Sequence, residues 1–229
     1  APLPDTLADL VAHRRRHLTD YQNAGLADRY QALVERVRTA EHAILPGHED
    51  LARAVAWNYA KLLAYKDEYE VARLYTDGRF AQDIADRFEG DFKLRFHLAP
   101  PLIAKRDPIT GHLKKQEFGS GMLWAFRLLA QLKGLRGTSL DIFGRSEERR
   151  AERQMIADYE ELIGALLPKL TAANLPTAVA LAALPEQIRG FGHVKEAAIA
   201  RAASQRAALL AKLDSPQPTG SASQPRAAE

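Results

Sequence analysis

Apolar residues recur three or four positions apart along most of this chain, and that spacing places them on one face of an α-helix. The most regular run follows Ser146 and ends near Leu170. Its apolar positions are Met155, Ile156, Tyr159, Leu162, Ile163, Leu166, Leu167 and Leu170. Ser146 can cap such a helix, and Glu147 and Glu148 follow in the first turn, where the helix dipole favours carboxylates. We therefore predict the longest helix of the chain here, in a central position.

The same periodicity predicts further helices on both sides of this run. Turn and breaker residues separate them, among them Asn23 to Gly25, Pro46-Gly47 and Pro185. The first two helices should form an antiparallel hairpin, because only a short turn joins them. The expected segments are residues 7–21, 26–44, 48–65, 68–77, 80–88, 120–132, 174–184 and 193–213.

Two of these helices carry a specific prediction about their start. Asp67 should act as an N-cap, with Glu70 at the capping-box position three residues later. Ser120 should cap the helix that runs to Leu132. The apolar residues of that helix lie on more than one face, so we predict that it is buried.

The middle of the chain has a different character. Pro100-Pro101 excludes a helix at that point. The string from Asp107 to Gly111 is a turn signal, and residues 102–105 and 112–118 could flank it as strands. We therefore predict a mainly α, multi-helix bundle-like domain with one small β-hairpin near residues 102–118.

Composition bounds the organisation of the 229-residue chain. Residues 1–214 hold the predicted helices and should form one helical domain, whereas residues 215–229 are mostly small and polar and should be a disordered, low-complexity tail. No apolar run approaches the roughly 20 residues that span a bilayer, so no membrane partner is expected. The chain begins at Ala1-Pro2 without an initiator Met, and we expect a piece of a longer protein.

Several kinds of site are absent from the sequence. The chain has no cysteine, which excludes disulfides and cysteine-ligated zinc or iron–sulfur clusters within it and fits a cytoplasmic location. No phosphate-binding glycine motif occurs. His13 and His17 have metal-ligand spacing, but the arginines between them would repel a cation, so we predict a solvated helix face and no metal. No residue is expected to be catalytic.

Basic residues beside glycines are the better candidates for a site. One group lies in the loop from Lys133 to Thr138, a second follows Ile188, and His97 stands alone before Pro100-Pro101. Such loops can hold a phosphate or a carboxylate, or their arginines can satisfy helix-end carbonyls and buried acids such as Asp67. Both interpretations stay open. The candidates are His97, Lys133, Arg136, Thr138, Arg189, His193 and Lys195.

Arg136 and Arg189 share one local pattern, since each follows an apolar residue and precedes a glycine. That pattern lets the backbone turn while packing holds the base of the side chain. We predict that both side chains point inward or along a shared groove, with His193 or Glu196 nearby, and that they form paired hydrogen bonds that a lysine could not reproduce.

An ordered set of strings resembles the C-terminal helical domain of the bacterial indolepyruvate ferredoxin oxidoreductases. The resemblance extends from about Leu7 to Lys195, and at one place it departs from the family pattern: Ser120-Gly121 stands where the family usually has Pro-Trp. The positions that carry it are residues 18–22, 33–38, Asn58, Lys61, 64–77, 88–90, 96–101, 118–119, 135–138, 143–144 and 188–196.

The resemblance implies a function that the residues alone do not. Enzymes of this family convert arylpyruvates to acyl-coenzyme A and carbon dioxide with thiamine diphosphate and iron–sulfur clusters, and they pass electrons to ferredoxin. The chain would then be a non-catalytic structural or interaction domain, without a cofactor of its own. Its partners would be the catalytic domains of the same polypeptide or subunit, or a second copy in a homodimer.

Two other functions remain open. In the first, His97, Arg136, Arg189, His193 and Lys195 contribute to the coenzyme A or substrate site. In the second, more distant, the chain binds nucleic acid through basic residues of its surface, an unfavoured function because the net charge is only +3. The residues for that function would be Arg14, Arg15, Arg16, Lys114 and Lys115.

Overall fold

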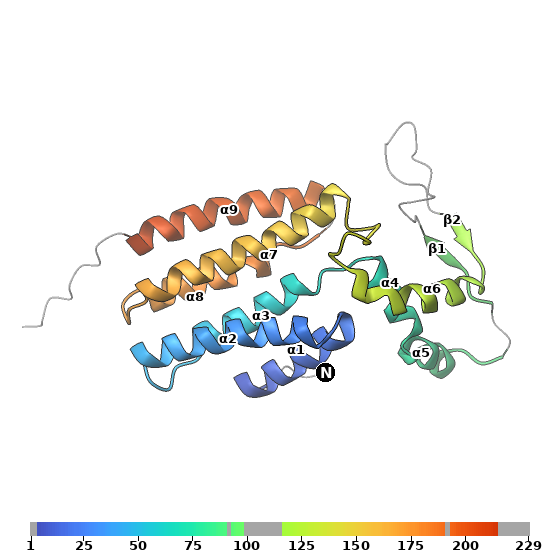
Figure 1. Ribbon diagram of the computed structural model, residues 1–229, viewed down its shortest axis with the longest axis horizontal. Helices are drawn as coiled ribbons and strands as arrows, with labels where there is room; N and C mark the ends of the chain where they lie inside the picture. Colours follow the sequence, from blue (N-terminus) through green and yellow to red (C-terminus); the bar gives the residue numbers. More distant parts are fainter. Residues whose placement is uncertain (1–3, 91–92, 99–115, 191–192, 215–229) are drawn as a thin grey trace, which may run out of the picture. The chain divides into compact units, whose positions relative to one another are not determined.

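A computed structural model describes residues 4–90, 93–98, 116–190 and 193–214 of the chain (Figure 1). Within these residues the protein has nine α-helices, three short 3-10 helices and one two-stranded antiparallel sheet. The predicted mainly α class with one small β element is therefore confirmed. The proposed tail at 215–229 lies outside the described residues.

The helices begin and end close to the predicted limits. The α-helices are α1 (Leu7–Tyr21), α2 (Ala24–Ile44), α3 (Asp50–Leu63), α4 (Glu68–Thr76), α5 (Arg79–Arg87), α6 (Met122–Gln131), α7 (Glu147–Leu166), α8 (Leu175–Ala183) and α9 (His193–Asp214). The other elements are the 3-10 helices η1 (Leu132–Leu135), η2 (Leu167–Lys169) and η3 (Leu184–Gln187) and the strands β1 (Phe96–Leu98) and β2 (Gln116–Phe118).

Backbone contacts divide the chain into two compact units. Unit 1 comprises residues 1–11, 31–59 and 159–229, and unit 2 comprises residues 12–30 and 60–158. Helices α1, α2, α3 and α7 contribute residues to both units.

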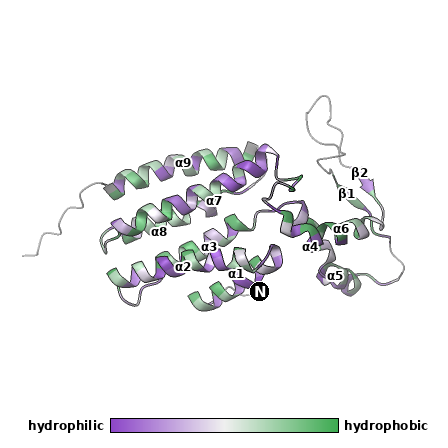
Figure 2. Cartoon of the chain, viewed as in Figure 1, coloured by the Kyte–Doolittle hydropathy of each residue, from purple (hydrophilic) through white to green (hydrophobic). Residues whose placement is uncertain are grey.

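The core of unit 1 is built from the apolar faces of its helices. Hydrophilic and hydrophobic residues alternate along α2, α7 and α9 (Figure 2), as expected for helices with one buried face. Tyr159 of α7 stacks on Tyr59 with 6.0 Å between ring centroids, and its hydroxyl donates to the Ala182 carbonyl at 2.9 Å. Other buried side chains of this core include Val37, Leu51, Val55, Ile163, Leu166, Leu175 and Leu181.

A buried carboxylate caps helix α3 from outside its own sequence. Glu41 of α2 is fully buried, and it accepts hydrogen bonds from the backbone N–H groups of Leu51 and Ala52, each at 2.9 Å. These N–H groups lie in the first turn of α3, where the helix itself offers them no acceptor. Helical periodicity did not predict this cap, because the acceptor lies ten residues before the donor.

An aromatic cluster forms the core around α4, α6 and the sheet in unit 2. Phe96 of β1 and Phe126 of α6 are buried together with Ala72 of α4. Tyr75 stacks on Phe126 with ring centroids 5.2 Å apart and meets Phe96 edge to face at 5.3 Å. Four rings in contact, with Phe80 of α5 the fourth, hold short elements that could not be stable alone.

The position of the sheet differs in part from the prediction. Phe96 pairs with Phe118 and Leu98 with Gln116, so β2 lies within the expected second strand. The strand that pairs with it is at residues 96–98, before the predicted range, and the rings of Phe96 and Phe118 both join the aromatic cluster. Residues 102–105 and the turn signal at 107–111 lie outside the described residues.

Helix α6 corrects two predictions. It begins at Met122 and Gly121 is its N-cap without a side-chain hydrogen bond, so Ser120 is not the cap. The helix is not buried on all faces either, because only Phe126 is fully covered whereas Trp124 and Leu128 are 69% and 49% exposed.

The predicted cap of α7 is confirmed, but its predicted rank in length is wrong. Ser146 Oγ accepts from the backbone N–H of Arg149 at 3.3 Å, and Glu147 and Glu148 occupy the first turn. The helix has 20 residues, whereas α9 has 22, because α7 ends at Leu166 and continues as the 3-10 helix η2, which contains Pro168.

Candidate functional site

Arg136 is the centre of a buried polar cluster in unit 2. Its side chain is 3% exposed, and its Nε and Nη2 atoms donate to the two carboxylate oxygens of Asp67 at 2.5 and 2.9 Å. Its Nη1 atom donates to the Tyr21 carbonyl at 2.7 Å, and the guanidinium lies 3.6 Å from the centre of the Tyr21 ring. The prediction that Arg136 points inward is therefore confirmed. Burial by itself would lower the pKa of Arg136, but the hydrogen bonds to Asp67 and the neighbouring charges outweigh it, so the pKa is raised.

Asp67 has a second role at the start of α4. Its Oδ1 atom accepts from the backbone N–H of Glu70 at 2.8 Å, which confirms the predicted N-cap. The Asp67 carboxylate thus caps α4 and also binds the Arg136 guanidinium, which reaches the C-terminal end of α1. The Tyr21 hydroxyl adds a further link, since it donates to the Tyr65 carbonyl at 2.9 Å.

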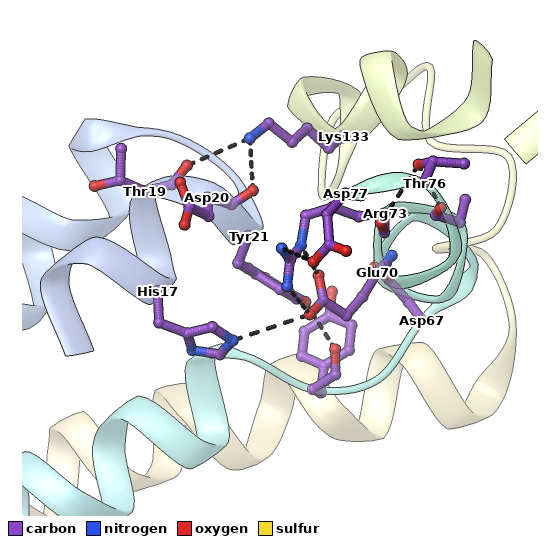
Figure 3. Close-up of polar contacts among 12 residues, drawn as sticks. His17, Thr19, Asp20, Tyr21, Asp67, Glu70, Arg73, Thr76, Asp77 and Lys133 are labelled. Atoms are coloured by element: carbon purple, nitrogen blue, oxygen red, sulfur yellow. Dashed lines mark hydrogen bonds and ion pairs between the residues drawn. The ribbon is translucent and has the colours of Figure 1, made fainter. Parts of the chain in front are cut away.

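The last carbonyls of α1 receive hydrogen bonds from two cations of the η1 region. Lys133 Nζ donates to the carbonyls of Asp20 at 2.5 Å and Thr19 at 3.4 Å (Figure 3), and Arg136 donates to that of Tyr21. Positive charge is favourable at a helix C-terminus, where the last carbonyls have no partner within the helix. Arg136 therefore satisfies a helix-end carbonyl as the structural interpretation predicted for the arginines, and Lys133, for which no such role was predicted, does the same.

Glu70 connects this cluster to α1 through a second set of charges. Its carboxylate accepts from Arg73 Nε at 2.8 Å and Nη2 at 2.7 Å, and His17 Nε2 lies 3.9 Å away (Figure 3). Burial by itself would raise the pKa of Glu70, but the hydrogen bonds from Arg73 and the nearby His17 outweigh it and lower the pKa to about 2. Glu70 is thus an ionised partner of Arg73, held on the first turn of α4.

The depressed pKa of Glu70 predicts a pH-dependent stability. A carboxyl group with a lowered folded-state pKa contributes stability above its unfolded value of about 4.3, and this contribution is lost as the pH falls through the folded value. For a folded pKa of about 2, the loss between pH 5 and pH 2 should be on the order of 3 kcal/mol. We expect the difference in unfolding free energy between the native chain and Glu70→Gln, measured by urea denaturation, to shrink across that range. A difference that stays constant would contradict the assignment.

Thr138 and His97 are exposed within unit 2. The Thr138 hydroxyl donates to the Leu135 carbonyl at 2.7 Å and so continues the turn after η1. His97 lies on β1 opposite Glu117 of β2. Among the described residues of unit 2, no hydrogen bond or ion pair joins His97 to the loop that carries Lys133, Arg136 and Thr138.

The prediction for Arg189 is wrong. Its side chain is 75% exposed, its Nε donates to the Glu186 carbonyl at 3.0 Å, and its nearest carboxylate is that of Glu186 at 3.7 Å. Arg189 lies in unit 1 after η3, where its acidic neighbour is itself on the surface, so nothing draws the guanidinium inward. His193 begins α9 and Lys195 is half-buried on the same helix.

Sequence analysis missed a second buried carboxylate, that of Asp141. Its oxygens accept from the backbone N–H groups of Gly137 at 2.8 Å, Phe143 at 3.2 Å and Gly144 at 2.9 Å, and from the Tyr69 hydroxyl at 3.3 Å. Asp141 thereby fixes the whole loop between η1 and α7. An Asp followed by a glycine three residues later is a turn signal that could have indicated this role.

In the described part of the chain, no group of three or more His, Asp or Glu side chains is arranged to hold a metal ion. No described helix combines the length and apolar character that crossing a membrane requires. The strongest clusters are thus the Arg136–Asp67 pair with its neighbours and the loop that Asp141 organises.

Comparison with known proteins gives one match. No curated protein and no solved structure matches the chain. One family model, described as a family of unknown function (DUF6537), matches residues 7–208 and so covers all nine helices that the structure describes except the last turns of α9. The chain, with its Arg136–Asp67 cluster and Asp141 loop, therefore belongs to the DUF6537 family.

Proposed function

We propose that this chain is a non-catalytic interaction domain of an indolepyruvate ferredoxin oxidoreductase. The whole enzyme would oxidatively decarboxylate arylpyruvates to acyl-coenzyme A, with thiamine diphosphate and iron–sulfur clusters held elsewhere and ferredoxin as electron acceptor. The proposal places the chain in the cytoplasm, against the catalytic domains of its own polypeptide or subunit. The ordered resemblance between Leu7 and Lys195 supports the choice of enzyme.

An exposed apolar face on α6 is the observation that carries the interaction role. Trp124 and Leu128 of α6 and Leu132, which caps the C-terminus of α6 and begins η1, follow one another at intervals of four residues and are 69%, 49% and 41% exposed. The opposite side of the helix packs into the aromatic cluster through Phe126. An apolar stripe with a tryptophan at one end is typical of a surface that a protein partner covers.

The roles of the basic residues also favour docking over direct ligand binding. Arg136 is bound to Asp67, and Lys133 is bound to carbonyls of α1. A guanidinium already paired with a buried carboxylate would have to give up that partner to hold a coenzyme A phosphate. For the nucleic-acid alternative, Arg15 is in an ion pair with Asp28 at 2.6 Å, and Lys114 and Lys115 lie outside the described residues.

The proposal predicts that polar substitution of the α6 face weakens association with the catalytic part. Trp124→Asp and Leu128→Asp should each cost at least about 2 kcal/mol of binding, the usual effect of a central interface residue. Association of the purified chain with the separately purified catalytic part can be measured by sedimentation velocity. Circular dichroism should show the same helix content in both variants, because the replaced side chains are exposed.

A matched control uses an exposed apolar residue of another helix. Val194 of α9 is 50% exposed, and Val194→Asp should leave the association unchanged. Equal weakening by all three substitutions would point to a general effect of charge. Association that survives both α6 variants, or acyl-coenzyme A formation by the purified chain alone with cofactors supplied, would overturn the proposed function.

A further inference from the structure

A basic pocket lies in unit 2, between the loop after η1 and the first turns of α7. Its volume is about 480 Å³. Three arginines line it, Arg145 before the helix and Arg150 and Arg153 on the helix, opposite Thr138 and Ser139. None of these arginines was singled out by its sequence pattern.

The positive charge of this pocket is not neutralised by acidic side chains. Arg145 Nη2 donates to the Ser139 carbonyl at 3.2 Å, and Arg150 donates to the Arg145 carbonyl through Nε at 3.2 Å and Nη2 at 2.8 Å. Arg153 Nη2 donates to the Gly144 carbonyl at 2.7 Å. Within the described ranges no carboxylate lies within ion-pair distance of these three groups, in contrast to Arg73 and Arg136.

One donor in the pocket lacks an acceptor. The Nη1 atom of Arg153 is buried and has no acceptor in hydrogen-bonding geometry among the described residues, although the Arg153 guanidinium lies near enough to the Tyr65 hydroxyl to act against the rise that burial causes in the pKa of Tyr65. A buried charged donor without an acceptor is unfavourable, and buried polar groups in folded proteins are almost always satisfied. A rotation of the Arg153 side chain into the pocket that it lines would let an anionic oxygen of a ligand accept from this donor.

The loop that forms one wall is already fixed in place. Asp141 also lines the pocket, but its two oxygens are occupied by the N–H groups of Gly137, Phe143 and Gly144 and by the Tyr69 hydroxyl. These hydrogen bonds stabilise the negative charge of Asp141 within the loop. The pocket lining therefore carries three guanidinium groups and one carboxylate, an excess of positive charge. The wall needs little rearrangement to bind an anion.

We infer that this pocket binds the phosphate groups of a phosphorylated small molecule. Guanidinium groups form paired, charge-assisted hydrogen bonds with phosphate oxygens, and three of them around one space match a diphosphate better than a single carboxylate. The volume exceeds that of one phosphate and lies in the range of small-molecule sites. This role goes beyond docking through α6, and it depends on none of the residues of that face.

The test is isothermal titration calorimetry of the chain with inorganic pyrophosphate as the probe. We expect saturable binding with one site, and at least a tenfold weaker affinity for Arg150→Gln and for Arg145→Gln. Both arginines are exposed, so the melting temperature of these variants should stay that of the native chain. Arg153→Gln should also weaken binding, and pyrophosphate should then no longer raise its melting temperature.

Controls separate a site from general charge attraction. Arg189→Gln removes an exposed arginine of unit 1 and should leave the affinity for pyrophosphate unchanged. Sulfate, added at the same concentration as pyrophosphate and at equal ionic strength, should not compete with pyrophosphate for the site. A second titration uses adenosine 3′,5′-bisphosphate. A higher affinity for this compound than for pyrophosphate would identify the ligand as a nucleotide, and an equal or lower affinity would identify it as a free diphosphate. No saturable binding by either probe, or equal losses in Arg150→Gln and Arg189→Gln, would overturn the inference without affecting the α6 docking test.

Discussion

Replacement of Arg136 by methionine should lower the free energy of unfolding by about 3–5 kcal/mol, the usual cost of removing one partner of a buried ion pair. The substitution keeps the apolar packing against Tyr21 but leaves the Asp67 carboxylate buried, with only the Glu70 N–H as a hydrogen-bond donor. It also leaves the Tyr21 carbonyl without its donor. Urea denaturation followed by circular dichroism at 222 nm measures the change.

Lysine at the same position tests whether the planar guanidinium matters. Arg136→Lys retains the charge but cannot bind both oxygens of Asp67 and the Tyr21 carbonyl at once, so we expect a loss of about 1–3 kcal/mol. Arg189→Lys is the matched control, because Arg189 also stands between an apolar residue and a glycine but is 75% exposed. Its stability should change by less than about 0.5 kcal/mol. Equal effects of the two lysine substitutions would show that burial of Arg136 contributes nothing.

A second large effect is expected from the aromatic cluster of unit 2. Phe126→Ala should cost about 3–5 kcal/mol, the range found for removal of a buried phenylalanine. The ring is 4% exposed, stacks on Tyr75 at 5.2 Å and meets Phe96 edge to face at 5.6 Å. Because Phe126 packs against Phe96 of β1, loss of the Phe126 ring should also expose the two-stranded sheet. Native-state hydrogen exchange would then show reduced protection in β1, β2 and α4.

Trp124→Ala is the control on the same helix. Trp124 lies two residues before Phe126 but is 69% exposed, so its removal should change the stability of the isolated chain by less than about 0.5 kcal/mol. The two substitutions remove similar amounts of aromatic surface and both introduce a good helix former. A loss of several kcal/mol in Trp124→Ala would mean that the α6 face is already covered within the chain, and it would remove the basis for docking through that face.

Local signals in the sequence determined most of the secondary structure. The limits of α1, α2, α3 and α9 agree with the predicted ones to within two residues, because a period of 3.6 and a breaker residue at each end are properties of neighbouring positions. The N-cap at Asp67 was predicted for the same reason, since its acceptor and the Glu70 N–H are three residues apart. Ser120 shows the limit of that approach, because a polar residue before a helix is a cap only if the backbone starts the helix there.

Tertiary structure alone decided which of two equivalent arginines became buried. Arg136 and Arg189 have the same kind of neighbours, and each is followed by a glycine of positive φ, 76° at Gly137 and 100° at Gly190. Only Arg136 finds a buried carboxylate and a helix end, and both partners lie far away in the sequence, Asp67 by 69 residues and Tyr21 by 115.

The exposure of α6 and the grouping of Arg145, Arg150 and Arg153 around one pocket were likewise beyond the reach of periodicity. An apolar face is buried only if another element covers it, and arginines at the start of a helix line a pocket only if another segment forms the opposite wall, which here is the preceding loop that the Asp141 bonds hold in place. Helical periodicity is a property of adjacent residues, so the sequence by itself determined the helices of this protein. Burial and charge pairing depend on residues brought together from distant positions, and the tertiary structure therefore decided its candidate sites.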